Sequence, residues 1–155
     1  MIQRIQTLYL LLIVILSGVV LFSAFAGFVN TTDALNYIVN YKGVFLVQAN
    51  GNQFLQNVWG VTALAAIIPL VALVTIFLYK KRSLQIKLSI FNIVLMAAYY
   101  GVLFFYLWQF GSVYHADWFL EVVTAFPLVN VILSALAIRS IRKDEALIKS
   151  LNRLR

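Results

Sequence analysis

Three side chains that can bind a metal or move a proton lie close together in the sequence, in the order His115, Asp117 and Glu121. A protein zinc site takes three or four ligands, yet this is the only histidine of the chain and the chain has no cysteine. A hydrolase built on Ser112 and His115 would also need oxyanion donors, and the sequence contains no nucleophile elbow. We therefore expect no metal, no cofactor and no enzymatic activity, and we interpret His115 as a hydrogen-bonding residue at a membrane interface.

Two asparagines, Asn92 and Asn130, fall inside long apolar stretches. An amide buried in lipid needs a partner, and hydrogen bonds of this kind between helices contribute about 0.6 to 2 kcal/mol. Asn130 could meet the carbonyl freed by Pro127 or a hydroxyl on another helix. The hydroxyl candidates are Ser17, Thr62 and Thr75. We interpret both asparagines as interhelical polar contacts, and their different depths argue against a direct pair.

The composition of the chain indicates whether these side chains lie in water or in a membrane. The chain is 63% hydrophobic and only 11% charged, and its mean hydropathy is +0.94. Soluble domains are about 45–50% apolar and about 25% charged. A soluble core of 155 residues could not hide this much apolar surface, because a domain of that size still exposes roughly 30% of its unfolded area. The sequence therefore predicts an integral membrane protein.

Four apolar stretches are long enough to cross a hydrocarbon core of roughly 30 Å as helices. We place these spans at residues 5–28, 58–79, 88–110 and 118–138. The connection over residues 29–57 is the only long one, and residues 139–155 form a charged tail. Because the spans leave no room for a soluble domain, we expect residues 1–155 to form one membrane domain.

The positive charges of the chain are distributed unevenly between the two sides of these spans. Cationic loops remain in the cytoplasm during membrane insertion, so the side with more Lys and Arg is the inner one. Eleven of the twelve cations fall on one side, namely Arg4, Lys80, Lys81, Arg82, Lys87, Arg139, Arg142, Lys143, Lys149, Arg153 and Arg155. The opposite loops hold only Lys42. The sequence therefore predicts that both termini are cytoplasmic.

Spans with short connections and both ends inside predict an all-α membrane protein, an antiparallel four-transmembrane-helix bundle. Residues 29–57 are rich in β-branched and aromatic side chains, and turn-forming clusters lie at residues 40–43 and 49–52. Such a pattern indicates a small extracytoplasmic β-hairpin. Residues 139–155 contain no Gly or Pro and favour a basic cytoplasmic helix.

The basic tail has two interpretations that the residues alone leave open. A basic helix beside a membrane can lie on, or continue away from, an anionic leaflet, with an attraction of about 1 kcal/mol for each nearby cation. The same helix could dock a cytoplasmic or membrane protein. No nucleic-acid-binding fold accompanies these charges, so we do not expect DNA or RNA as a partner.

Three stretches together resemble a known family. They are residues 1–7 (MIQRIQT), residues 77–88 (FLYKKRSLQIKL) and the tail at residues 139–155 (RSIRKDEALIKSLNRLR). The chain resembles a family of small four-span inner-membrane proteins of Bacteroidota, a domain of unknown function. The resemblance implies a bacterial inner membrane and no particular activity. All three stretches fall on the predicted cytoplasmic side, so the resemblance makes a protein partner on that side as plausible as lipid. The contact residues would be Arg4, Gln6, Arg82, Gln85, Lys87 and the tail.

Our leading hypothesis is a non-enzymatic accessory or scaffold protein that binds a partner or anionic lipid through its basic cytoplasmic face. The alternative is a small transporter or lipid-binding protein with a pocket between the second and fourth spans, near Pro69, Pro127 and Asn130. The small residues Gly18, Ala24 and Gly27 offer a face to a second copy. The sequence leaves the oligomeric state and the identity of any partner open.

Overall fold

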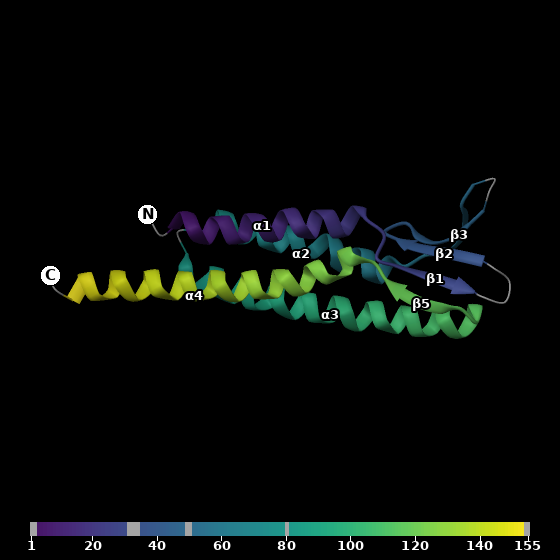
Figure 1. The fold of residues 1–155 in the computed structure, drawn as a ribbon. Coiled ribbons are helices and arrows are strands. Elements are labelled where there is room, and N and C mark those ends of the chain that lie inside the picture. Colours follow the sequence, from purple (N-terminus) through teal and green to yellow (C-terminus); the bar gives the residue numbers. More distant parts are fainter. Residues whose placement is uncertain (1–2, 31–34, 49–50, 80, 154–155) are drawn as a thin grey trace.

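The computed structural model describes residues 3–30, 35–48, 51–79 and 81–153, with side chains described between residues 5 and 146. Four helices form an elongated helical body, and a five-stranded sheet lies at one of its ends (Figure 1). The helices are α1 (Gln3–Phe22), α2 (Trp59–Phe77), α3 (Arg82–Tyr114) and α4 (Phe126–Arg153). The strands are β1 (Ala26–Asn30), β2 (Leu35–Asn40), β3 (Gly43–Val47), β4 (Gln53–Gln56) and β5 (Asp117–Leu120).

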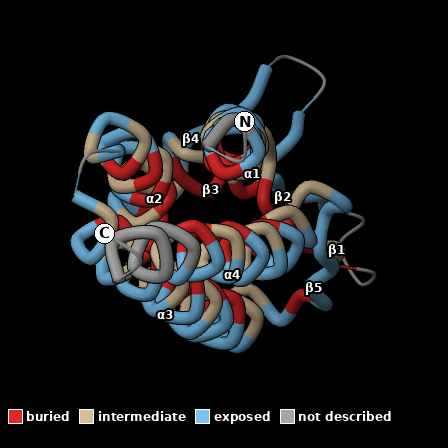
Figure 2. Tube along the Cα trace, turned by 90° about the vertical axis from the view of Figure 1, so that its left-hand side faces the viewer, coloured by how far each residue is buried: buried red, intermediate tan, exposed pale blue. Residues whose placement is uncertain are grey.

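The four helices pack side by side in a ring. Each helix contacts the next along the chain, and α4 closes the ring against α1. The end-on view of Figure 2 shows the buried residues on the sides where the helices face one another. We call the end that carries the sheet the sheet end. The opposite end, with Lys81, Arg82, Arg139, Arg142 and Lys143, is called the basic end.

The helices expose apolar side chains and bury polar ones. Each of the four contains a window that is long and apolar enough to cross a membrane, and 28% of each window is buried. Leucine, isoleucine, valine and phenylalanine side chains cover the outer faces. The buried polar side chains of the four helices are Gln6, Ser17, Thr75, Gln85, Ser89, Asn92, Asn130, Ser134 and Asp144. This distribution is compatible with a membrane protein, whose ionisable and polar side chains face the interior of the helix assembly.

The predicted all-α fold class is wrong, because the chain also forms a five-stranded antiparallel sheet in the order β4-β3-β2-β1-β5. Two of its strands, β1 and β5, lie mostly within residues that we assigned to the first and fourth spans. The first helix ends at Phe22, and Ala26–Asn30 pairs with β2 on one side and β5 on the other. The fourth helix begins only at Phe126, after β5 and a short 3₁₀ helix at Val122–Ala125. Apolar residues can form either a transmembrane helix or a β-strand. These two segments form strands because each pairs with a segment that is distant in the sequence.

The predicted two-stranded hairpin is a part of this larger sheet. Residues 40–43 do form a turn, which joins β2 to β3 and is closed by the Lys42 backbone N–H donating to Asn40 Oδ1 at 2.9 Å. Strand β3 then pairs with β4, and the residues between them include Asn50, which lies outside the described residues. Two strands alone are marginal in water, whereas a five-stranded sheet with one face packed on a helix is stable.

Helix α3 supports the sheet, because its 33 residues extend about 50 Å, well beyond the span of a bilayer core. Its last turns pack against the sheet through Phe110, whose ring meets Phe28 edge-on, with ring centroids 6.4 Å apart. Asn30 Nδ2 donates to the Tyr114 carbonyl at 3.2 Å. The sheet is therefore tied to the helical body through the far third of α3.

The charged tail is not a separate helix. Helix α4 runs without interruption from Phe126 to Arg153, and Figure 1 shows it extending past the beginning of α1. Residues 139–153 therefore continue the fourth helix and form no helix of their own.

We predict that Gly43→Ala destabilises the sheet strongly. Gly43 has φ +143°, and an added Cβ would lie 2.3 Å from the Gln56 carbonyl oxygen. Backbone strain and overpacking should together lower the free energy of unfolding by about 2–4 kcal/mol. Unfolding in mixed micelles, followed by tryptophan fluorescence, measures this change. As a control, Gly18→Ala in α1 meets nothing within 4 Å, and it should keep or slightly raise stability. Equal stabilities of the two variants would contradict this account of the turn.

Candidate functional site

Four buried polar residues, one from each helix, lie near the basic end and form two hydrogen-bonded pairs. They are Gln6 on α1, Thr75 on α2, Gln85 on α3 and Asp144 on α4. Gln6 Nε2 donates to Asp144 Oδ2. Gln85 Nε2 donates to the Thr75 carbonyl at 3.0 Å. These two hydrogen bonds link α1 to α4 and α2 to α3, so they hold the helices together where the apolar body ends.

Asp144 is the residue of this group that our sequence analysis missed. It is only 5% exposed, although it lies in a segment that we described as a basic tail. A signal was present, because one helix face recurs at four- and three-residue steps, through Asn130, Ser134, Ala137, Ile141 and Asp144. The inward face of the fourth helix therefore continues past Ile138, where we ended the span.

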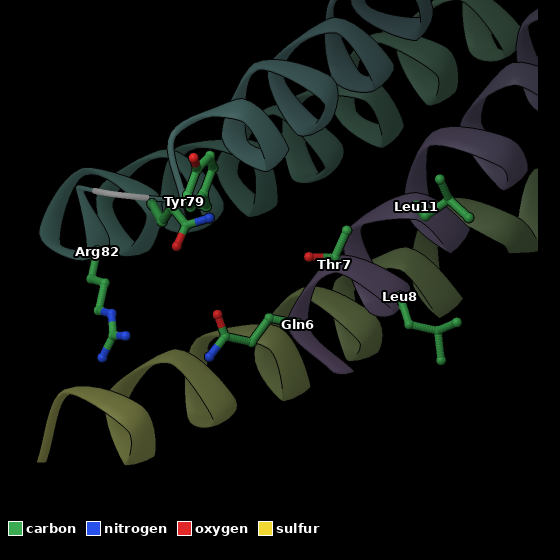
Figure 3. Close-up of a pocket in the computed structure, with 7 residues that line it drawn as sticks. Gln6, Thr7, Leu8, Leu11, Tyr79 and Arg82 are labelled. Carbon is green, nitrogen blue, oxygen red and sulfur yellow. The ribbon is translucent and has the colours of Figure 1, made fainter. Parts of the chain in front are cut away.

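A pocket of about 400 Å³ opens beside this group. Small-molecule sites typically have volumes of about 300–1,000 Å³. The pocket is lined by Gln6, Thr7, Leu8, Leu11, Tyr79, Arg82 and Gln85. In Figure 3, Gln6 extends from α1 into the gap, Arg82 extends from the start of α3 toward α4, and Leu8 and Leu11 lie along α1. The pocket thus has a polar part at the basic end and an apolar part along the first helix.

Among the side chains that the structure describes, Arg82 is the only charged one that lines this pocket. Its Nη1 atom is buried and has no hydrogen-bond partner among the described residues. A buried polar group without a partner costs free energy, and more so when the group is charged. A guanidinium presents its donors as a planar fork that matches carboxylate and phosphate oxygens. The pocket is therefore suited to a ligand that brings an anionic oxygen to Arg82.

The other predicted contact residues divide into three groups. Lys81, Lys87, Arg139, Arg142 and Lys143 are exposed and lie outside the pocket lining. Gln85, which we placed on the contact surface, is buried with an exposure of 3%. The remaining cations lie outside the described residues or have side chains that are not described, namely Arg4, Lys80, Lys149, Arg153 and Arg155.

The two asparagines in the helical body are both buried. Asn130 Nδ2 donates to Ser17 Oγ at 2.9 Å, which links α4 to α1. The other two hydroxyl candidates bond backbone carbonyls instead, Thr62 that of Tyr41 and Thr75 that of Val71. Asn92 Oδ1 has no hydrogen-bond partner in the described part of the chain. The structure thus places Asn130 in an interhelical contact and gives no such partner for the Asn92 oxygen.

Two further cavities are smaller or more apolar. One is lined by Ser17, Val20, Ala65, Ile68, Tyr99 and Pro127, at the place where we considered a transport pocket, and it measures only about 10 Å³. Such a volume holds about one water molecule. The other, about 330 Å³, lies at the sheet end between α3 and the residues around Glu121. It is lined by Tyr100, Phe104, Leu120, Glu121, Thr124, Ala125 and Leu128.

The three residues with metal-binding side chains sit on different elements of the sheet end. His115 caps α3 in a left-handed conformation, with φ 48°. Asp117 lies in β5, and Glu121 precedes the 3₁₀ helix. All three side chains are exposed. Within the described residues no three His, Cys, Asp or Glu side chains gather in a metal-binding group.

The sequence of the chain matches one protein family over nearly its whole length. Residues 2–154 match the family described as Domain of unknown function (DUF4293). The chain belongs to this family. No curated protein and no solved structure matches the chain. Membership in DUF4293 brings no activity with it.

We predict that Gln6 and Asp144 are energetically coupled. Hydrogen bonds to a charged group contribute about 1.5–3 kcal/mol, so a double-mutant cycle with Gln6→Ala and Asp144→Ala should give a coupling energy in that range. The cycle is completed by measuring the free energy of unfolding in mixed micelles for the unmodified protein, the two single variants and the double variant. The matched cycle pairs Gln6→Ala with Arg142→Ala, whose side chain is exposed, and it should give a value near zero. A Gln6–Asp144 coupling no larger than this control would contradict the described contact.

Proposed function

We propose that this protein is a non-enzymatic accessory protein of the bacterial cytoplasmic membrane that binds anionic lipid at its basic end. The observation that carries the proposal is the pocket of about 400 Å³ beside Arg82. The Arg82 Nη1 atom is buried and has no partner in the described part of the chain, so an anion bound there would satisfy it. The resemblance to proteins of Bacteroidota supports the assignment to a bacterial inner membrane.

The apolar part of the pocket favours lipid as the ligand. Leu8 and Leu11 line the pocket and are 54% and 48% exposed. An acyl chain lying along these side chains would be held by van der Waals packing, because lipid tails are as apolar as leucine and give no hydrophobic driving force inside the membrane. A lipid whose headgroup reaches Arg82 would satisfy both parts of the pocket.

The orientation of the protein follows from its charges. The basic end carries exposed Lys81, Arg139, Arg142 and Lys143, and the positive-inside rule places such an end in the cytoplasm. The inner leaflet is also where anionic lipid attracts cations, by about 1 kcal/mol for each. These exposed cations would raise the local concentration of anionic lipid, and the pocket would bind one molecule of it. The small cavity beside Pro127 gives no comparable support to a transport function.

The absence of cysteine from the sequence allows a direct test of orientation. We expect a single cysteine at the exposed Lys143 position (Lys143→Cys) to react with a membrane-impermeant maleimide only after the inner membrane is opened. A single cysteine at the exposed Gln53 position (Gln53→Cys) should react in intact spheroplasts. Labelling of both from the same side, or the reverse pattern, would contradict the proposed orientation.

Lipid binding is tested by native mass spectrometry of the protein released from nanodiscs of mixed phosphatidylglycerol and phosphatidylcholine. We expect the full-length protein to retain phosphatidylglycerol preferentially and Arg82→Gln to weaken this retention about tenfold or more, because a charge-assisted hydrogen bond is lost.

The matched control is Lys87→Gln, which removes the same charge from an exposed position on the same helix. This variant should change retention little. Equal retention of the two lipids by the unmodified protein would contradict the proposal.

A further inference from the structure

The pocket at the basic end contains two amide groups whose orientation is fixed by their partners. Gln6 Nε2 donates to the carboxylate of Asp144, and Gln85 Nε2 donates to the Thr75 carbonyl. A carboxylate oxygen and a backbone carbonyl oxygen accept hydrogen bonds, so the NH₂ side of each amide faces its partner. These two contacts set the orientation of both amides.

This arrangement leaves the two carbonyl oxygens, Gln6 Oε1 and Gln85 Oε1, on the sides of the amides that face away from these partners. Both glutamines line the pocket. In Figure 3 the oxygen of Gln6 points into the gap between α1 and the segment that carries Tyr79, whereas its nitrogen points toward α4. The glutamines thus offer the pocket hydrogen-bond acceptors, and a ligand must bring hydrogen-bond donors to meet them.

The pocket therefore combines three recognition features. Arg82 can bind an anionic oxygen. Gln6 and Gln85 can accept hydrogen bonds from donors on the ligand. Leu8 and Leu11 can contact an apolar chain. A phosphodiester lipid whose headgroup carries hydroxyl groups has all three. An ammonium headgroup would also supply donors, but the described cations at the basic end outnumber Asp144 and Glu145. The field of this end therefore favours a ligand with a net negative charge.

We propose that the pocket is a selective site for a lipid with a hydroxylated phosphodiester headgroup of the phosphatidylglycerol class. In this site Arg82 binds the phosphate, and the carbonyl oxygens of Gln6 and Gln85 accept hydrogen bonds from the glycerol hydroxyls. Asp144 is a positioning residue, because it fixes the amide of Gln6 without lining the pocket. This inference rests on the proposed function and adds to it the chemical class of the headgroup.

The test compares short-chain lipids of matched charge on the full-length protein in detergent. Dioctanoyl phosphatidylglycerol and dioctanoyl phosphatidylethanol carry the same single negative charge, but only the first has headgroup hydroxyls. We expect the dissociation constant for phosphatidylglycerol to be about tenfold lower, as two neutral hydrogen bonds would give. The zwitterionic phosphatidylethanolamine should bind more weakly than phosphatidylglycerol. Free glycerol phosphate, which lacks the acyl chains, should not compete at the same concentration.

Two variants separate headgroup selectivity from anion binding. In Asp144→Asn the new amide can donate to Gln6 Oε1, which allows the glutamine to turn its NH₂ toward the pocket, so the preference for phosphatidylglycerol over phosphatidylethanol should fall to about threefold or less. Gln85→Met removes the second acceptor at similar volume and should reduce the preference in the same way. In both variants binding should still depend on Arg82. Glu145→Gln removes one charge from the neighbouring position and should leave the preference unchanged.

The outcomes distinguish this inference from the proposed function. Equal binding of phosphatidylglycerol and phosphatidylethanol, or tighter binding of phosphatidylethanolamine, would overturn the headgroup assignment while leaving anionic-lipid binding in place. Competition by free glycerol phosphate would assign the site to a soluble phosphate ester. Binding of phosphatidylcholine as tight as that of the anionic lipids would remove the proposed function itself.

Discussion

Polar side chains inside an apolar helical body must find hydrogen-bond partners within the protein, in other side chains or in backbone carbonyls, and this constraint fixes how the helices pack. Gln6 with Asp144, Gln85 with the Thr75 carbonyl and Asn130 with Ser17 each join two different helices. Apolar residues face outward and provide no hydrophobic drive for association when the solvent is lipid. Packing and these hydrogen bonds must therefore fix which helix faces meet. The same bonds decide which atoms remain free to face the pocket at the basic end.

The sheet end follows a different rule. There the chain leaves the helical body and satisfies its backbone through strand pairing, with β1 in contact with β2 and β5. Helix α3 is long enough to pass from one region to the other, so Phe110 and Tyr114 can support the sheet. One helix thus connects the pocket, which includes Arg82 at its first residue, to the sheet at its last turns.

The candidate site was only partly predictable. The cluster of cations around Arg82 was visible in the sequence, because charge patterning needs no fold to be recognised. Gln85 was visible too, but as a surface residue, since a glutamine beside lysines gives no sign of burial. Asp144 was missed because its neighbours Lys143 and Glu145 made the segment look solvated. Its burial depends on α4 continuing along α1, which is a property of two helices together.

Composition and hydropathy alone determined that four segments of this chain are long and apolar enough to cross a membrane, because length and apolarity are local properties. They also located the turn at residues 40–43, whose residues favour a reversal. Only the tertiary structure decided that residues 26–30 and 117–120 are strands, since both segments are apolar enough for helix and obtain their strand partners from distant parts of the chain. It likewise decided the orientation of the Gln6 and Gln85 amides, because hydrogen-bond partners on other helices set the direction of each amide.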